Sequence, residues 1–94
     1  MVGFKKRLEV FNTGPSGDKR EARALTVAER IIQARHGARA RFAQYNYRPG
    51  GVVVEEPGAV GYLAIVWDGE QYDAHPEESL VGNDGGFAIH QLKY

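Results

Sequence analysis

Residues 18–37 read DKREARALTVAERIIQARHG and carry the strongest local structure signals of the chain. Asp18 followed by Glu21 three residues later is the pattern of a capping box at a helix start. Gly37 is suited to the left-handed conformation in which many helices end. Between them, apolar residues recur at the 3.6-residue spacing of one helix face: Ala24, Leu25, Ala28, Ile31 and Ile32. We therefore predict one α-helix over about residues 18–36, with one apolar side.

Extended segments flank this helix. Residues 4–11 alternate between apolar and charged side chains, which is typical of a half-buried strand. Residues 38–47 alternate again, placing Arg39, Arg41, Tyr45 and Tyr47 on one face. Residues 52–55 form a further short strand in this interpretation, before the break at Pro57-Gly58.

The most apolar stretch is residues 60–67, and Asp68-Gly69 follows it directly. Because Asp-Gly is a preferred pair for a two-residue hairpin, we expect residues 70–74 to return antiparallel to that strand. Residues 76–86 are polar and rich in turn residues, with a reversal predicted at 83–86. The last strand is predicted at residues 87–94.

The predicted fold class is α+β, with a single domain over residues 1–94. The element order is β-α-β-(β)-β-β-β, in which the bracketed strand is the short one at residues 52–55. One helix would pack on a largely antiparallel sheet of four to six strands, giving a two-layer sandwich.

Composition limits the classes of function. The 94 residues are 43% hydrophobic and 26% charged, which is typical of a globular protein. They include no cysteine, which excludes disulfides, thiolate metal sites and cysteine nucleophiles. No apolar run approaches 18 residues, and no signal-peptide pattern follows the basic start, so we expect a cytoplasmic protein that does not span a membrane. The preference for arginine over lysine suggests a bacterial or phage source.

Charge is distributed unevenly along the chain. Residues 1–50 hold 11 of the 12 Lys and Arg residues but 4 of the 12 Asp and Glu residues, so the two parts carry +7 and −7. The split is compatible with a basic or acidic binding surface, and equally with two parts that neutralise each other in the folded chain.

A binding function is the leading hypothesis. The strand at 60–67 is apolar on both sides, yet one helix covers only one face of a sheet. Long loops, a second copy of the chain or another molecule would have to shield the other face. We expect a small non-catalytic regulatory or inhibitory domain that binds a protein partner or itself. Arginine and tyrosine are enriched at interfaces, so the expected contact residues are Arg39, Arg41, Tyr45, Tyr47 and Arg48.

Nucleic-acid binding is the alternative. Lys19, Arg23 and Arg30 lie on one stripe of the predicted helix and could contact phosphates, together with Arg39 and Arg41. The same stripe is also typical of the solvated side of an amphipathic helix. A net charge of zero argues against a nucleic-acid reader.

No pattern in the sequence indicates catalysis, a metal or a cofactor. The cluster Asp73, His75, Glu77 and Glu78 has ligand types but is more typical of a solvated acidic loop. The glycine-rich turn at residues 14–19 lacks the spacing of a phosphate loop. A hydrolase that uses His75 with Asp73 or Glu77 is the third hypothesis, and we expect no catalytic residue, metal site or cofactor.

Overall fold

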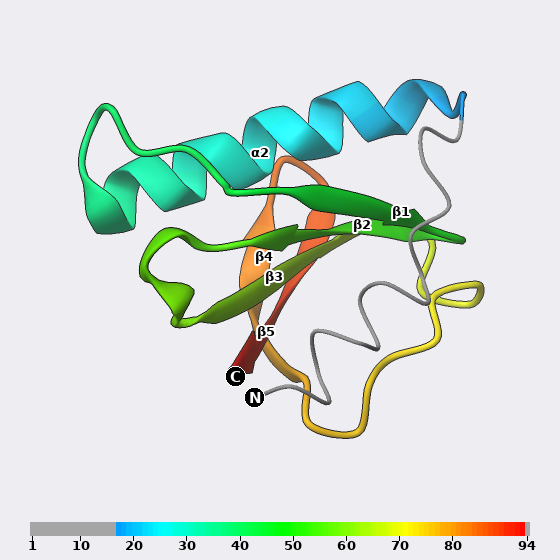
Figure 1. The fold of residues 1–94 in the computed structure, drawn as a ribbon. Helices are drawn as coiled ribbons and strands as arrows, with labels where there is room; N and C mark the ends of the chain where they lie inside the picture. Colours follow the sequence, from blue (N-terminus) through cyan, green and yellow to red (C-terminus); the bar gives the residue numbers. More distant parts are fainter. Residues whose placement is uncertain (1–16, 94) are drawn as a thin grey trace.

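Within residues 17–93, which the computed structural model describes, the fold is one α-helix packed on a five-stranded antiparallel sheet (Figure 1). The strand predicted at residues 4–11 lies outside these residues. In chain order, the elements are α2 (Lys19–His36), β1 (Tyr45–Arg48), β2 (Gly51–Glu55), the 3₁₀ helix η1 (Pro57–Ala59), β3 (Gly61–Val66), β4 (Ser79–Asp84) and β5 (Phe87–Lys93). The predicted two-layer α+β class is confirmed.

Local capping sets the ends of α2. A carboxylate oxygen of Asp18 accepts a hydrogen bond from the backbone N–H of Arg20 at 2.8 Å, which satisfies one of the donors that a helix start leaves open. At the other end, Gly37 has a φ of 113° and its N–H bonds the carbonyl of Gln33 at 2.9 Å. The predicted helix and both of its boundary residues are confirmed.

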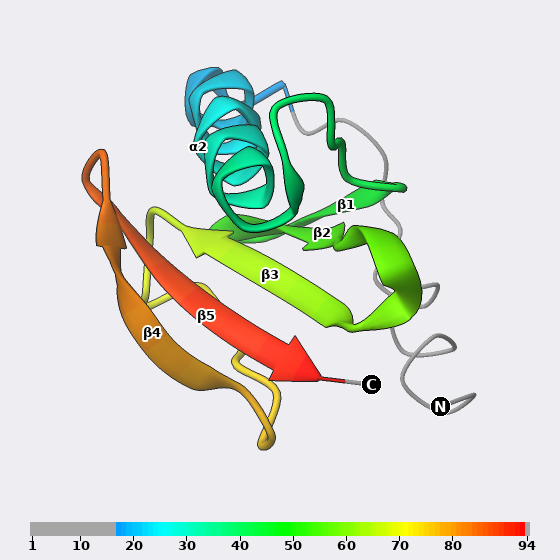
Figure 2. The ribbon, with the colours of Figure 1, turned by 90° about the vertical axis from the view of Figure 1, so that its left-hand side faces the viewer.

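The strands lie in the order β1-β2-β3-β5-β4, and every neighbouring pair is antiparallel. Within the described residues, β1 and β4 are therefore the edge strands. Helix α2 packs on β2 and β3, and Figure 2 shows β5 and β4 curving away from it on one side. One flank of the sheet is thus covered less completely than its centre.

The second predicted strand is shorter than its alternation suggests. Residues 38–44 form a connection, and β1 begins only at Tyr45, opposite Val54 of β2. Two further bonds prolong the ladder: the N–H of Glu55 donates to the carbonyl of Gln44, and the N–H of Ala43 donates to the carbonyl of Glu55. Pairing stops there because β2 ends at Glu55 and η1 begins with Pro57, which has no N–H to donate. Residues 38–42 alternate between apolar and polar side chains but form no strand, because they have no neighbouring strand to pair with.

The hairpin predicted at Asp68-Gly69 is wrong. Oδ1 of Asp68 accepts from the backbone of Glu70 at 3.1 Å, and its carbonyl accepts from the N–H of Tyr72 at 3.0 Å, so the chain turns back on itself. Residues 70–74 form no strand. Both edges of β3 are already paired, with β2 and with β5, which leaves no position for a returning strand. β4 is instead built from residues predicted as a polar loop, while the reversal before β5 is confirmed.

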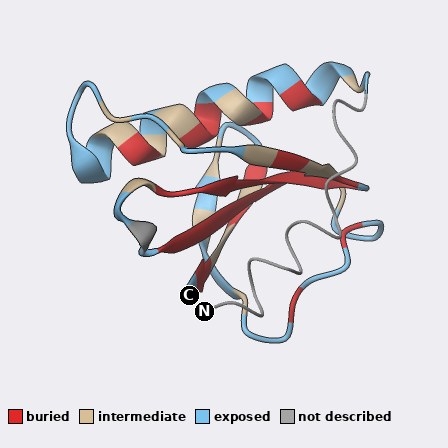
Figure 3. Cartoon of the chain, in the orientation of Figure 1, coloured by how far each residue is buried: buried red, intermediate tan, exposed pale blue. Residues whose placement is uncertain are grey.

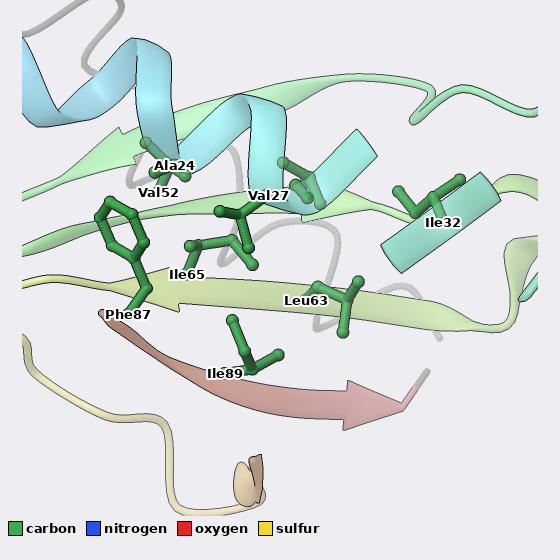
Figure 4. Packing of buried hydrophobic residues seen from close by; sticks show 10 residues of the cluster. Ala24, Val27, Ile32, Val52, Leu63, Ile65, Phe87 and Ile89 are labelled. Atoms are coloured by element: carbon green, nitrogen blue, oxygen red, sulfur yellow. The ribbon is translucent and has the colours of Figure 1, made fainter. Parts of the chain in front are cut away.

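Apolar side chains fill both faces of the sheet centre. Figure 3 shows the central strands β2 and β3 coloured as buried. Between helix and sheet, Val27, Leu63 and Phe87 belong to the main core, seen from close by in Figure 4. On the second face, a smaller cluster consists of Val53, Tyr62, Ala64, Val66, Tyr72 and Leu92. All six of these residues are buried within the one chain, and Tyr72 comes from the loop after β3. The second face is therefore not the open surface that the sequence led us to expect.

Candidate functional site

The five residues predicted to bind a partner do not share a face. Tyr45 and Tyr47 point to the helix side of β1, where Tyr45 packs against the main core and Tyr47 stacks on Trp67 with ring centroids 6.5 Å apart. Burial, together with the neighbouring Glu21 carboxylate, raises the pKa of Tyr45. Arg48 points to the opposite face because side chains alternate along a strand.

Arg48 is buried in a polar cluster. Its guanidinium carbon lies 4.6 Å from the ring centroid of Tyr72, and its Nη1 lies 3.8 Å from the Glu78 carboxylate. The Tyr72 hydroxyl donates to Glu78 at 2.8 Å. Burial first, and the Glu78 carboxylate second, raise the pKa of Tyr72. With only 5% of its surface exposed, Arg48 is placed to hold the loop of residues 67–78 against the sheet.

Arg39 and Arg41 lie in the exposed connection between α2 and β1. Arg41 donates to the Glu29 carboxylate of α2 at 2.8 Å. These two arginines are accessible, but the structure brings them neither to β1 nor to Arg48. Partner binding by the five predicted residues stays a prediction. These residues do not form one continuous surface.

The basic helix residues are exposed and face the far flank of the sheet. The Arg23 guanidinium lies 5.5 Å from the ring centroid of Phe87, and Arg30 donates to Asp84 at 2.8 Å. Lys19 is exposed at the first turn of α2. Arg23 and Arg30 therefore lean towards β4 and β5, next to the part of the sheet that α2 covers least.

Two neighbouring depressions, of about 210 and 270 Å³, lie between α2 and the β4–β5 hairpin and form a groove that the Arg30–Asp84 ion pair divides. We call it the β4 groove, and the residues that line it are Arg23, Thr26, Val27, Arg30, Ile31, Arg35, Val81, Gly82, Asn83, Asp84, Gly85, Phe87 and Ile89. Its lining is apolar and polar in nearly equal parts, and its helix rim carries three arginines. Each depression is smaller than the roughly 300–1,000 Å³ of a typical small-molecule pocket, and suits a side chain.

Strand β4 is the exposed edge of the sheet. Leu80 is 60% exposed and Val81 is 50% exposed, whereas the other edge, β1, alternates between buried and half-buried residues. Opposite the consecutive residues His90 and Ile89 of β5 stand Leu80 and Gly82, so Val81 is an extra residue in a bulge. Exposed apolar residues on a sheet edge are uncommon, because unpaired backbone groups there attract other strands.

Sequence reasoning missed β4. Its only apolar pair, Leu80-Val81, stands among Glu, Ser, Gly, Asn and Asp residues that favour turns. The one available signal was the position of that pair, six residues before the strand predicted at residues 87–94, which is the spacing of a hairpin partner.

A buried carboxylate joins the end of α2 to the sheet. Glu56, 3% exposed, accepts hydrogen bonds from Arg35 at 3.2 Å, His36 at 3.0 Å and Gln91 at 2.9 Å. Burial alone would raise the pKa of Glu56, but these three donors outweigh it and lower that pKa. Because an ionised carboxylate only accepts, the His36 ring nitrogen facing it is the donor. The cluster positions Arg35 at the end of the β4 groove.

The third hypothesis, a hydrolase, depends on His75. This residue is buried, and its Nδ1 accepts from the backbone N–H of Glu77 at 3.2 Å. The carbonyl of Asp73 accepts from Arg48. Over residues 17–93, no three His, Asp or Glu side chains are grouped so as to hold a metal ion. The geometry therefore places His75 in the packing of the loop after β3.

Comparison with protein-family models, with curated proteins and with solved structures finds no match for this chain. In the part of the chain that the structure describes, no helix combines the length and apolar character needed to cross a membrane.

Proposed function

We propose that this chain is a small non-catalytic protein-binding domain, regulatory or inhibitory in role, that engages its partner through β4 and the β4 groove. One observation carries the proposal: β4 is a sheet edge that exposes Leu80 and Val81 beside a groove whose lining includes Ile31 and Ile89. Apolar side chains on an edge strand favour association, since they lose contact with water when a partner covers them.

The β4 groove replaces the surface expected from the sequence. Tyr45 and Tyr47 pack on the helix side of the sheet, and Arg48 is buried. These residues are therefore not the main contacts in this proposal. Arg39 and Arg41 are exposed but lie outside the β4 groove, so this proposal gives them no contact. The arginines that line the binding surface are instead Arg23, Arg30 and Arg35.

A pair of matched variants tests the proposal. Val81→Asp puts a charge in the β4 groove, while Val60→Asp puts one on an equally exposed valine that lies in a separate depression. Both should leave the free energy of unfolding within about 0.5 kcal/mol of wild type, because exposed side chains carry little packing. Immobilised wild type and Val60→Asp should retain the same host protein, and Val81→Asp should lose most of it.

Hydrogen exchange on the captured complex completes this test. Backbone amides of residues 79–84 should exchange more slowly in the complex than in the free chain. Equal retention by both variants, or slowed exchange confined to other elements, would refute the use of β4. Light scattering on the free chain checks whether the partner is a second copy.

Nucleic-acid binding is the second candidate, supported by the exposed basic residues of α2, among them Lys19, Arg23 and Arg30. Two of these already have partners, Phe87 for Arg23 and Asp84 for Arg30, which reduces what they offer to phosphates. A gel shift at low salt decides it. Phosphate-driven binding must appear there and weaken steeply as salt rises, and the absence of a shift removes this candidate.

A further inference from the structure

The shape and charge of the β4 groove indicate what kind of partner it takes. We propose that it binds an extended segment of a partner protein in which acidic residues alternate with apolar ones, added beside β4 as a further strand. This inference rests on the proposed function and specifies the chemistry of its partner.

The free edge of β4 favours an extended segment. Among the described residues, β4 pairs with β5 on one side and is last in the sheet order. Backbone N–H and C=O groups on the outer side of an edge strand are ready to pair with another chain. A partner segment that pairs there gains main-chain hydrogen bonds, while its side chains alternate between the two faces of the sheet.

The two faces of β4 offer different surfaces to such alternating side chains. Leu80 stands opposite His90 and so lies on the face away from α2, where it is exposed. Val81 lies on the helix face, beside Ile31 and Arg35 in the groove. A short apolar side chain would cover Leu80. On the helix face, a glutamate would rest its methylene groups on Val81 and Ile31 and extend its carboxylate to an arginine.

Charge distinguishes this partner from a second copy of the chain. The groove lining carries Arg23, Arg30 and Arg35 against one carboxylate, Asp84. Antiparallel pairing of two β4 strands would bring the helix arginines of both copies to the same face of the joined sheet, where like charges repel. An acidic segment meets the same arginines with opposite charge.

The arginines are able to accept a new partner. Arg30 gives one N–H to Asp84 while its side chain stays 58% exposed, so other donors of its guanidinium face solvent. Arg35 is held by Glu56 and by Gln91, at 2.6 Å from the Gln91 oxygen, and is 38% exposed. Its side chain is thus positioned before any ligand arrives, which lowers the entropy lost on binding.

The probe is a capped peptide of about eight residues in which glutamate and valine alternate, titrated into the full chain while backbone amide shifts are recorded. A lysine–valine peptide of the same length is its matched control. The glutamate–valine peptide should shift the amides of residues 79–84 most, and raising salt from about 50 to about 500 mM should weaken it. The lysine–valine peptide should bind at least about fivefold more weakly.

Two arginine variants locate the charge. Arg30→Glu should weaken the glutamate–valine peptide about fivefold or more, because attraction becomes repulsion. Arg41→Glu is the matched control, since Arg41 also forms an exposed 2.8 Å ion pair but lies outside the groove, and it should leave affinity within about twofold. Equal binding of both peptides, or equal effects of both variants, would overturn the inference.

The remaining outcomes separate this inference from the proposed function. If no peptide shifts residues 79–84 while the captured protein still protects them and still depends on Val81, strand addition is wrong and the protein-binding function stands. If Val81→Asp retains the host protein, both fail together. A single-stranded oligonucleotide that shifts these amides more than the glutamate–valine peptide at low salt also overturns the inference.

Discussion

Replacing Glu56 by glutamine should destabilise the fold by about 1.5–2 kcal/mol. The carboxylate is almost fully buried and accepts from Arg35, His36 and Gln91, and hydrogen bonds to a charged group contribute about 1.5–3 kcal/mol. Glutamine keeps the shape and one acceptor oxygen, but in either orientation its N–H₂ faces at least one of the three donors. The lower part of that range applies because Arg35 is 38% exposed and can turn to water.

The assay is urea unfolding at pH 7, with thermal unfolding as a second measurement. A loss of this size corresponds to a melting temperature roughly 6–16 °C lower for a domain of this length. The control is Glu29→Gln, which removes the carboxylate of the exposed ion pair with Arg41. It should cost no more than about 0.5 kcal/mol, because exposed pairs contribute little.

The pH dependence follows from the direction of the Glu56 pKa shift. The folded chain lowers this pKa below its ordinary value of 4.5, so the ionised carboxylate stabilises the fold above that value. The stabilisation is lost as pH falls through the lower pKa of the folded state. The difference in unfolding free energy between wild type and Glu56→Gln should therefore be smaller near pH 3 than at pH 7. A variant within about 0.5 kcal/mol of wild type at pH 7, or a difference that grows on acidification, would refute the reasoning.

Three further predictions concern packing and the backbone. Leu63→Ala, at a fully buried position between helix and sheet, should cost about 2–5 kcal/mol in urea unfolding, and a cost below about 1 kcal/mol would contradict the assigned core. Gly50→Ala should destabilise strongly, since φ is +87° and a Cβ would meet the backbone of the loop after β3. Gly69→Ala should change the melting temperature little, because open space surrounds Gly69. Similar shifts in melting temperature for Gly50→Ala and Gly69→Ala would show that the close approach of Gly50 to that loop is absent. Arg48→Ala should lower the free energy of unfolding by about 2–4 kcal/mol, because it leaves buried acceptors unpaired. The control Arg41→Ala should stay within about 0.5 kcal/mol of wild type, and equal costs for the two variants would contradict the structural role of Arg48.

The candidate site was only partly predictable. Counting the predicted elements indicated that a single helix leaves part of the sheet less covered. The structure shows that this flank is formed by β5 and β4. We predicted that the less covered part lies on the second face, around Tyr45 and Tyr47, but these two residues lie on the helix side of β1. Alternation along β1 shows which residues share a side, but not which side the helix covers. The sequence assigned Arg23 and Arg30 to the alternative function, nucleic-acid binding, and only the fold shows that they line the β4 groove.

Elements with local signals can be predicted from the residues alone. Asp18 and Gly37 limit α2 because capping bonds form within a few residues, and β3 is apolar on both sides whatever its neighbours are. Tertiary structure decided which strands pair. Asp68-Gly69 favours a hairpin in isolation, but β3 gains more by pairing with β2 and β5, and residues 79–84 become a strand only because β5 supplies a partner. Strand pairing joins residues far apart in the chain, so its free energy depends on contacts that no short stretch of sequence contains.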